Sequence, residues 1–600
     1  MTGAEYIAEF LARIRSDRVF LLTGGACAFM IDAVARHPKL SYTSFQHEQS
    51  AAMAADALWR VARKVGVSMA TSGPGATNLI TGIACSYFDS IPSLHITGQV
   101  NQRESSLFHG ANVRQSGFQE TKIVEMVRPI TKYAVLVKTA DELRTELAKA
   151  YSIATSGRMG PVLIDVPMDI QQIEVGDDII LPERIVSDAD PTQDVAKALT
   201  ESLRNARRPV VLWGAGIGLA DVQRETADWL RASGVPFVSS WAGLTFFDHD
   251  HPGFQGQIGV YGNRGANFIL QNADTVVVIG SRLDNRQRSG NASNFAVGAT
   301  VHVVDVDAEE LKKYGKDGYR TSQLDFRDLP AVLSKIEVPS VNRDWLDYLA
   351  EMKSRYYGKE TSTSARRLNT LSPYEVVRRL NEVIAKDAIV IGDTGAAVCW
   401  LHQSFRVKDH TLFTAGGNSP MGYALPAAIG AKLVAPDRQV VSYNGDGGFQ
   451  VNLQELQTIK QNDLDVAIVV MNNASYGIIK QFQDSYLGSR YKASRDGYSV
   501  PDLGKIADAY GLRYIRIERL DQITPAIFEG GAIIIDVALS EHTLIEPKLE
   551  MGRPINDQFP YLGEAEYASG NRFVTYQRPA TFYSSEKSPD HLRVKAAAPD

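Results

Sequence analysis

The segment that most constrains this chain is a glycine-rich turn, Tyr443 to Phe449, between two short strand-like runs. Residues 439–442 before it and the continuous apolar run 466–471 after it are typical of buried parallel strands. Between them, from 451 to 460, apolar residues recur close to the helical period. The sequence therefore predicts strand, glycine turn, helix and strand, with the turn at the carboxyl end of an open sheet, where such sheets bind ligands.

Two oxygen-bearing side chains flank this unit. Asp446 lies in the turn, and Asn473 follows directly after the second strand. Carboxylate and amide oxygens suit Mg²⁺, which completes its shell with phosphate and water, and the glycines beside Asp446 would let backbone approach a diphosphate. The alternative is an ordinary surface turn, which the paired asparagines 472 and 473 disfavour.

The same alternation of strands and helices runs through most of the 600 residues. Polar stretches at 177–193 and 351–371 read as linkers. We therefore predict an α/β protein with three doubly wound parallel-sheet domains. The expected ranges are 1–175, 190–345 and 365–545, followed by a C-terminal tail over 546–600 whose last residues, from 587, look disordered.

Composition excludes several classes of protein. The net charge of −6 gives no basic field for nucleic acid, and no apolar run approaches the length of a membrane span. The start of the chain lacks the pattern of a secretory signal. The three cysteines show neither a CxxC pair nor metal-ligand spacing, which favours a reducing compartment. We expect a cytoplasmic protein with no nucleic-acid or membrane partner.

Further motifs lie upstream of the glycine turn. They are HEQSAAMAADALWR at 47–60, TSGPGATN at 71–78, FQE at 118–120, RPITK at 128–132 and GPVLIDVP at 160–167. Together with GDG and NN, in this order, they resemble the acetolactate synthase group of thiamine diphosphate enzymes. The resemblance spans residues 1 to about 545.

The resemblance implies roles for particular residues. Glu48 would hydrogen-bond the aminopyrimidine ring of thiamine diphosphate and favour the tautomer that accepts the C2 proton. Asp446, Asn473 and the backbone carbonyl of Ser475 would hold Mg²⁺. Met421 would be the apolar wedge that bends the cofactor. The plainer alternatives are a charge at a helix start for Glu48 and a core methionine for Met421.

The middle domain carries a weaker signal. Its glycine turn at 214–218 is equally typical of a tight strand–helix connection. Residues 281–286, SRLDNR, resemble the flavin-contacting segment of the acetolactate synthases, which implies bound FAD without a redox role. The alternative is an empty central domain, as in many decarboxylases of the family.

The resemblance implies decarboxylation of pyruvate, or a related 2-oxo acid, and transfer of the two-carbon unit to a carbonyl acceptor. The sequence departs from the family pattern in three places: Ala396-Ala397 replace a His-Gln pair, Ser419 replaces a glycine, and Phe482 replaces a tryptophan. The tryptophan belongs to recognition of a second 2-oxo acid in the family, so its loss leaves the acceptor open. A keto-sugar nucleotide acceptor, which the start of the tail weakly resembles, and a pyruvate oxidase-like reaction remain alternatives. A non-catalytic regulator is disfavoured because Glu48 and Asp446 are both retained.

The family implies a homodimer or homotetramer, because its active sites form between subunits. The implied catalytic residues are Glu48, Gly25 and Gln119, and Arg286 matches an arginine that binds the acceptor carboxylate. The implied metal ligands are Asp446, Asn473 and Ser475. The implied cofactor-binding residues are Gly75, Asn78, Gly395, Ser419, Met421, Gly445, Gly447, Gly448 and Tyr476 for thiamine diphosphate, and Gly214, Gly216, Arg282, Asp305 and Asp325 for FAD.

Overall fold

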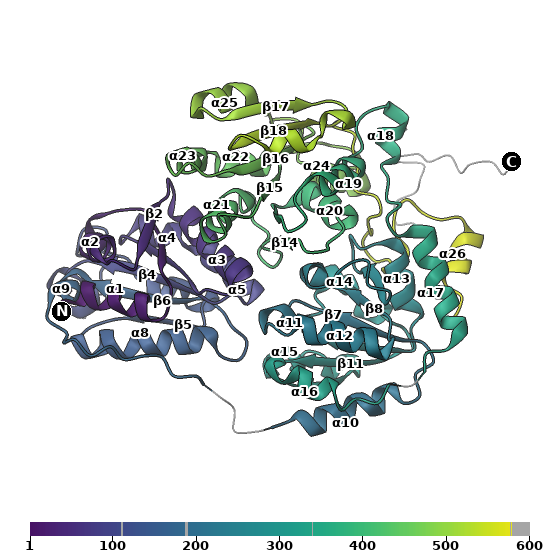
Figure 1. The fold of residues 1–600 in the computed structure, drawn as a ribbon, viewed down its shortest axis with the longest axis horizontal. Helices are drawn as coiled ribbons and strands as arrows, with labels where there is room; N and C mark the ends of the chain where they lie inside the picture. Colours follow the sequence, from purple (N-terminus) through teal and green to yellow (C-terminus); the bar gives the residue numbers. More distant parts are fainter. Residues whose placement is uncertain (110–111, 186–189, 339, 577, 579–600) are drawn as a thin grey trace.

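The apolar runs of the sequence form the central strands of three separate sheets in the computed structural model (Figure 1). The structure describes residues 1–109, 112–185, 190–338, 340–576 and 578. Each sheet has six strands, and all neighbouring strands are parallel. The prediction of three doubly wound α/β domains is therefore confirmed.

The first sheet has the strand order β2-β1-β3-β4-β6-β5. Its strands β3 and β4 are buried at every position, as expected for parallel strands covered on both faces. The strands are β1 Arg18–Leu21, β2 Ser41–Ser44, β3 Gly66–Ala70, β4 Ser93–Gln99, β5 Tyr133–Leu136 and β6 Val162–Pro167. The helices are α1 Gly3–Arg13, α2 Ala28–Arg36, α3 Glu48–Ala62, α4 Pro74–Asn78, α5 Ile80–Asp89, α6 Ser106–His109, α7 Ile123–Val127, α8 Ala140–Thr155 and α9 Met168–Gln172.

The second sheet has the order β12-β11-β10-β7-β8-β9. Its strands are β7 Pro209–Trp213, β8 Phe237–Ser239, β9 Phe254–Gln257, β10 Thr275–Ile279, β11 Thr300–Asp305 and β12 Arg320–Gln323. The helices are α10 Thr192–Leu203, α11 Gly216–Leu219, α12 Gln223–Ser233, α13 Arg264–Asn272, α14 Asn285–Arg288, α15 Ala308–Lys312 and α16 Leu329–Leu333.

The third sheet has the order β14-β13-β15-β16-β18-β17. Its strands are β13 Ile389–Gly392, β14 Thr411–Phe413, β15 Val440–Gly445, β16 Val466–Asn472, β17 Arg513–Ile517 and β18 Ile533–Ala538. The helices are α19 Pro373–Val383, α20 Gly395–Ser404, α21 Ala424–Val434, α22 Asp446–Val451, α23 Leu456–Gln461, α24 Gly477–Tyr486 and α25 Leu503–Tyr510. Asp446 thus begins a helix, where the sequence analysis placed it inside a turn.

The first and third domains share a core. The alanine-rich helices α3 and α21 pack side by side (Figure 1), and Ala51, Ala54, Ala424 and Ala427 are fully buried in one cluster. A β-carbon added to Gly430 would lie 2.4 Å from the carbonyl oxygen of Ala54. Small side chains therefore set the close approach of these helices.

The polar stretch 351–371, which the sequence predicts to be a linker, is partly helical. Helix α17, Arg343–Tyr356, runs into it, and α18, Thr363–Leu368, lies within it. Trp345, Tyr348 and Met352 of α17 are fully buried on one face, and Leu349 is nearly so. Because the other face of α17 is polar, the overall composition of the segment does not reveal this apolar stripe.

The C-terminal segment leaves the third sheet and crosses the central domain. Leu549 N donates to the Val260 carbonyl at 2.8 Å, and Asn267 Nδ2 donates to the Ile555 carbonyl at 2.9 Å. Helix α26, Glu564–Gly570, then lies near α17 and α13 (Figure 1). The expected disorder from residue 587 lies outside the described residues. In the described ranges, no helix is long and apolar enough to cross a membrane.

Candidate active site

In each sheet the connections that follow two neighbouring strands run in opposite directions, and this strand-order reversal lies between β1 and β3, between β7 and β10, and between β13 and β15. Open α/β sheets bind ligands beyond the carboxyl ends of the strands at such a reversal. Predicted site residues follow these strands in all three domains. They are Gly25 and Gly75 in the first, Gly214 and Arg282 in the second, and Gly395 and Asp446 in the third.

Asp446, Asn473 and Ser475 are buried beyond the ends of β15 and β16. Tyr498 Oη donates to Asp446 Oδ1 at 2.8 Å, whereas Asp446 Oδ2 has no partner in the described chain. The Asn473 amide nitrogen and the Ser475 hydroxyl also lack partners there. The two ends of the Asn473 amide can exchange by a half-turn. Other buried polar atoms in the described residues also lack partners, for example at Ser239 and Gln257, but here a carboxylate, an amide and a hydroxyl gather at one sheet edge, which fits residues that hold a cation.

The electrostatics of Asp446 suit this role. Burial raises its pKa to about 6, while the hydrogen bond from Tyr498 and the nearby backbone N–H groups of Gly447, Ala474 and Asn473 oppose that rise. The carboxylate is therefore ionised at neutral pH, as a metal ligand must be. A β-carbon on Gly477 would lie 2.7 Å from the Asn473 amide, so glycine leaves that side chain its place.

Two predicted cofactor-binding side chains, those of Tyr476 and Met421, lie next to Gly447. A β-carbon there would lie 2.3 Å from the Tyr476 ring and 3.3 Å from Met421 Cε. Met421 is half-buried rather than a core methionine. Gly445, the last residue of β15, has more room, since its added β-carbon would lie 3.8 Å from the nearest heavy atom, in Ala397.

Asp393, which the sequence analysis did not single out, connects the turn to the preceding loop. Its buried carboxylate accepts from Ala424 N at 3.1 Å and from Gly422 N at 3.2 Å, and Gly448 packs against it. Burial raises the pKa of Asp393 to about 6. Its position was visible in the sequence, because Asp393 directly follows the strand β13, but its backbone partners were not.

Gly395 and Ser419 lie close to this loop. Gly395 begins α20 with a φ of 71°, and a β-carbon there would be 3.7 Å from Ile478 of α24. Ser419 has a φ of 53°, and its hydroxyl lies 2.7 Å from Thr394 Oγ1. The left-handed backbone explains why a glycine would also fit at residue 419.

Glu48, Gly75 and Asn78 come together in the first domain. Glu48 begins α3 and is 6% exposed, and Asn78 Nδ2 donates to its Oε2 at 2.9 Å. A β-carbon on Gly75 would lie 3.2 Å from Glu48 Oε1, so a larger residue would crowd the carboxylate. Glu48 therefore lies in a specific buried setting, beyond what a helix-start charge requires.

Gly25 and Gln119 lie at the same edge of the first sheet. A β-carbon on Gly25 would have no heavy atom within 4 Å, so this residue borders open space. Gln119, with a φ of 63°, packs against Gly73, whose added β-carbon would lie 2.9 Å from Gln119 Cβ. Phe118 beside it is 84% exposed. The loop is anchored by Glu120, which accepts from Ser116 N at 2.8 Å.

The site residues thus form two half-sites. The first half-site is Glu48, Gly75 and Asn78, and the second half-site is Asp446, Asn473 and Ser475. In the residues that the structure describes, no hydrogen bond joins one half-site to the other. The two domains touch elsewhere, for example where Gln46 N donates to Glu455 at 3.3 Å.

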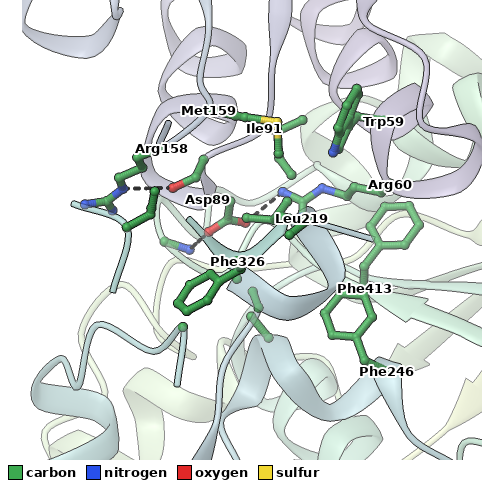
Figure 2. Close-up of a pocket in the computed structure, with 18 of the residues that line it drawn as sticks. Trp59, Arg60, Asp89, Ile91, Arg158, Met159, Leu219, Phe246, Phe326 and Phe413 are labelled. Carbon is green, nitrogen blue, oxygen red and sulfur yellow. Dashed lines mark hydrogen bonds and ion pairs between the residues drawn. The ribbon is translucent and has the colours of Figure 1, made fainter. Parts of the chain in front are cut away.

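A cavity of about 960 Å³ lies between the three domains (Figure 2). Gly216, Arg282, Asp305 and Asp325 line it, as predicted for FAD-binding residues. Gly214 lies just outside the lining, and its added β-carbon would be 1.9 Å from the Gly280 carbonyl oxygen. The volume is that of a site for a large small-molecule ligand.

The cavity combines apolar surfaces with charges. Leu219, Phe246, Phe326 and Phe413 contribute apolar surface (Figure 2). Arg282 lies 3.7 Å from Asp284, and Asp325 pairs with Arg327. Burial raises the pKa of the Asp305 carboxyl. Such a lining suits a ligand with both planar rings and charged groups.

Comparisons with known proteins match all three domains. Residues 1–126 match the N-terminal TPP binding domain of thiamine pyrophosphate enzymes, residues 196–320 match their central domain, and residues 393–537 match their C-terminal TPP binding domain. An acetolactate synthase large subunit of Corynebacterium glutamicum is 32% identical, over 98% of this chain and 95% of the relative. The isozyme 2 large subunit of Escherichia coli is 32% identical, over 92% and 98%.

Proposed function

Since the chain belongs to the thiamine pyrophosphate (thiamine diphosphate) enzymes, in the group of the acetolactate synthase large subunits, we propose that it decarboxylates pyruvate and transfers the two-carbon unit to a carbonyl acceptor. The resemblance seen in its motifs is thereby confirmed. The relatives favour an acetolactate synthase-type reaction over an oxidase or a keto-sugar carboligase.

One observation carries the proposal. The second half-site holds a buried carboxylate oxygen, a buried amide and a buried hydroxyl without partners, beyond the carboxyl ends of β15 and β16 in the third sheet. In the proposal, Asp446, Asn473 and the backbone carbonyl of Ser475 hold Mg²⁺ there. The turn around Gly447 and Gly448 binds the diphosphate, in the domain over residues 365–545.

The domain over residues 1–175 would bind the pyrimidine ring. Glu48 would exchange a proton with a ring nitrogen, and Asn78 and Gly75 would keep its carboxylate in place. Met421, in contact with the Gly447 turn, supplies an apolar support for the bent cofactor. Gly25 and Gln119 border the open space in which the substrate would lie.

When bound, thiamine diphosphate supplies the carbon nucleophile and the electron sink for decarboxylation of a 2-oxo acid. Pyruvate loses its carboxyl carbon as carbon dioxide, and its C2 forms a bond to the carbonyl carbon of the acceptor. The electron pair left by carbon dioxide forms the new bond, so no oxidant is consumed. A proton must reach the acceptor oxygen, and the name acetolactate implies a second pyruvate as acceptor.

FAD would occupy the cavity of the central domain, residues 190–345. Gly216 would bring the backbone close to the ligand, Gly214 would let the turn pack against Gly280, and Arg282, Asp305 and Asp325 would provide polar contacts. Because the proposed reaction is redox-neutral, the flavin has a structural role.

We propose a homodimer or a higher homo-oligomer in which the first half-site of one subunit faces the second half-site of another. Large apolar side chains are exposed beside both half-sites. Phe118 is 84% exposed beside Gln119, and Ile479, on the helix after Ser475, is 50% exposed. Association would cover them. The three free, buried cysteines suit a reducing compartment, so we place the enzyme in the cytoplasm.

Product analysis tests the proposal. The protein is incubated with ¹³C-labelled pyruvate, thiamine diphosphate, Mg²⁺ and FAD, and the products are followed by NMR. Acetolactate and carbon dioxide in equal amounts are expected. Carbon dioxide released only when another carbonyl compound is added would reassign the acceptor. Acetate or acetyl phosphate formed with flavin reduction would overturn the carboligase assignment.

A further inference from the structure

In the described residues, only one oxygen of the Asp446 carboxylate accepts a hydrogen bond. Tyr498 Oη donates to Oδ1 at 2.8 Å, and Oδ2 is buried without a partner. Tyr498 lies 52 positions downstream, in an irregular segment between α24 and α25. A hydroxyl that donates to an ionised oxygen forms a strong hydrogen bond, which limits rotation of the carboxylate.

Tyr498 is itself held from two directions. Gln450 Nε2 donates to Tyr498 Oη at 3.2 Å and to the Asp446 carbonyl at 3.1 Å, so the helix that begins at Asp446 fixes the hydroxyl. The Tyr498 ring lies 4.3 Å from the ring of Tyr476, measured between centroids. Tyr476 N in turn donates to the Ser494 carbonyl at 2.9 Å. The hydroxyl is thus prepositioned relative to Asp446.

We propose that Tyr498 is a positioning residue for the metal site: its hydroxyl donates a hydrogen bond to Asp446 Oδ1 and thereby directs Oδ2 toward Mg²⁺. The inference rests on the proposed function, since it assumes that Asp446 holds the metal. Groups that hydrogen-bond a metal ligand orient it, and their loss weakens metal binding about 10–100-fold. Tyr498 touches neither metal nor substrate in this role and acts through Asp446.

Tyr498→Phe tests the assignment, because it keeps the aromatic ring beside Tyr476 and removes only the hydroxyl. Binding of thiamine diphosphate is measured by isothermal titration calorimetry at a series of Mg²⁺ concentrations. The variant should need about 10–100-fold more Mg²⁺ for half-maximal binding. Saturating Mg²⁺ should restore the affinity for thiamine diphosphate, which a damaged fold would not permit.

Tyr491→Phe is the matched control. Tyr491 lies in the same segment, and its hydroxyl also donates to a buried carboxylate, that of Asp484, which is no metal ligand here. This control should keep the Mg²⁺ requirement of the wild type. Gln450→Leu, which removes the donor to Tyr498 Oη, should raise the requirement by less than Tyr498→Phe does.

The possible outcomes distinguish a failure of the role assigned to Tyr498 from a failure of the proposed function. An unchanged Mg²⁺ requirement in Tyr498→Phe, with normal binding by the wild type, would overturn the role of Tyr498 alone. An equal rise in Tyr498→Phe and Tyr491→Phe would assign the hydroxyl to folding of the segment and would also overturn it. A wild type without Mg²⁺-dependent binding of thiamine diphosphate would overturn the proposed function and this inference together.

Discussion

Gly448 packs so closely against Asp393 that no larger residue fits at position 448. A β-carbon on Gly448 would lie 1.8 Å from Asp393 Oδ2. Gly448 lies in the first turn of α22, and Asp393 follows β13. The carboxylate of Asp393 receives the backbone N–H groups of Gly422 and Ala424. The contact therefore couples the turn that we propose binds the metal to the segment that carries Met421.

Gly448→Ala should break this coupling. The Asp393 carboxylate must move and leave backbone N–H groups unsatisfied, at about 1–3 kcal/mol for each group. We expect a lower thermal unfolding midpoint and affinity for thiamine diphosphate at least about tenfold weaker, by the same free-energy scale. Gly445→Ala is the control for folding, because its β-carbon would have 3.8 Å of room. Equal midpoints for the two variants would contradict the prediction.

Glu48→Gln should slow deprotonation of the cofactor while leaving it bound. The amide still fits beside Asn78, but it cannot exchange a proton with the pyrimidine ring. The expected loss is about 10²–10⁴-fold in exchange of the C2 proton for deuterium, measured by acid quenching and NMR. The affinity for thiamine diphosphate should fall much less, because the metal contacts belong to the other half-site. Unchanged exchange with bound cofactor would reduce Glu48 to a helix-start charge.

Leu219→Trp should expel FAD. Leu219 lines the central cavity (Figure 2), and the larger ring would take up space that the flavin needs. We expect the wild type to be yellow and to release FAD on denaturation, and the variant to bind substantially less. Leu346→Trp is the control, since Leu346 is 44% exposed on α17 and does not line the cavity. A colourless wild type that takes up no FAD would place the central domain in the empty class.

Asp165→Asn should reduce the fall in stability that the wild type shows between pH 5 and pH 8. Burial raises the pKa of Asp165 from 3.8 to about 7, against hydrogen bonds from Thr97 and Gln99 that lower it. The folded state therefore holds a proton that the unfolded state loses near pH 4, and the free energy of unfolding falls as pH rises toward 7. Asparagine removes this term, which is on the order of 1–4 kcal/mol. Thermal midpoints of both proteins at the two pH values test it, and an unchanged difference would contradict it.

The second half-site was largely predictable from the sequence. Asp446, Asn473 and Ser475 follow two strands that are adjacent in the sheet, so local pattern and strand order suffice to bring them together. Glu48 was predictable for a similar reason, because the helix start and the strand before it are continuous in the chain. Whether these residues bind their ligands stays a prediction.

Asp393 and Tyr498 could not be placed in the same way. Tyr498 reaches Asp446 from an irregular segment whose course depends on long-range contacts, including the bond from Tyr476 N to the Ser494 carbonyl. Asp393 acts through backbone N–H groups at 422 and 424, which carry no side-chain signal. Helix α17 was obscured because only one of its faces is apolar.

The crossing of the C-terminal segment over the central domain sets an order of events during synthesis. Asn267 and Asn272 of α13 donate to the carbonyls of Ile555 and Gly570. The chain must grow by about 250 residues after β12 before both acceptors exist, which takes about 10–50 s at common translation rates. Until then these buried amides lack those partners. The central domain thus completes these contacts only after the third domain has been made, and truncation near residue 545 should leave both amides without them.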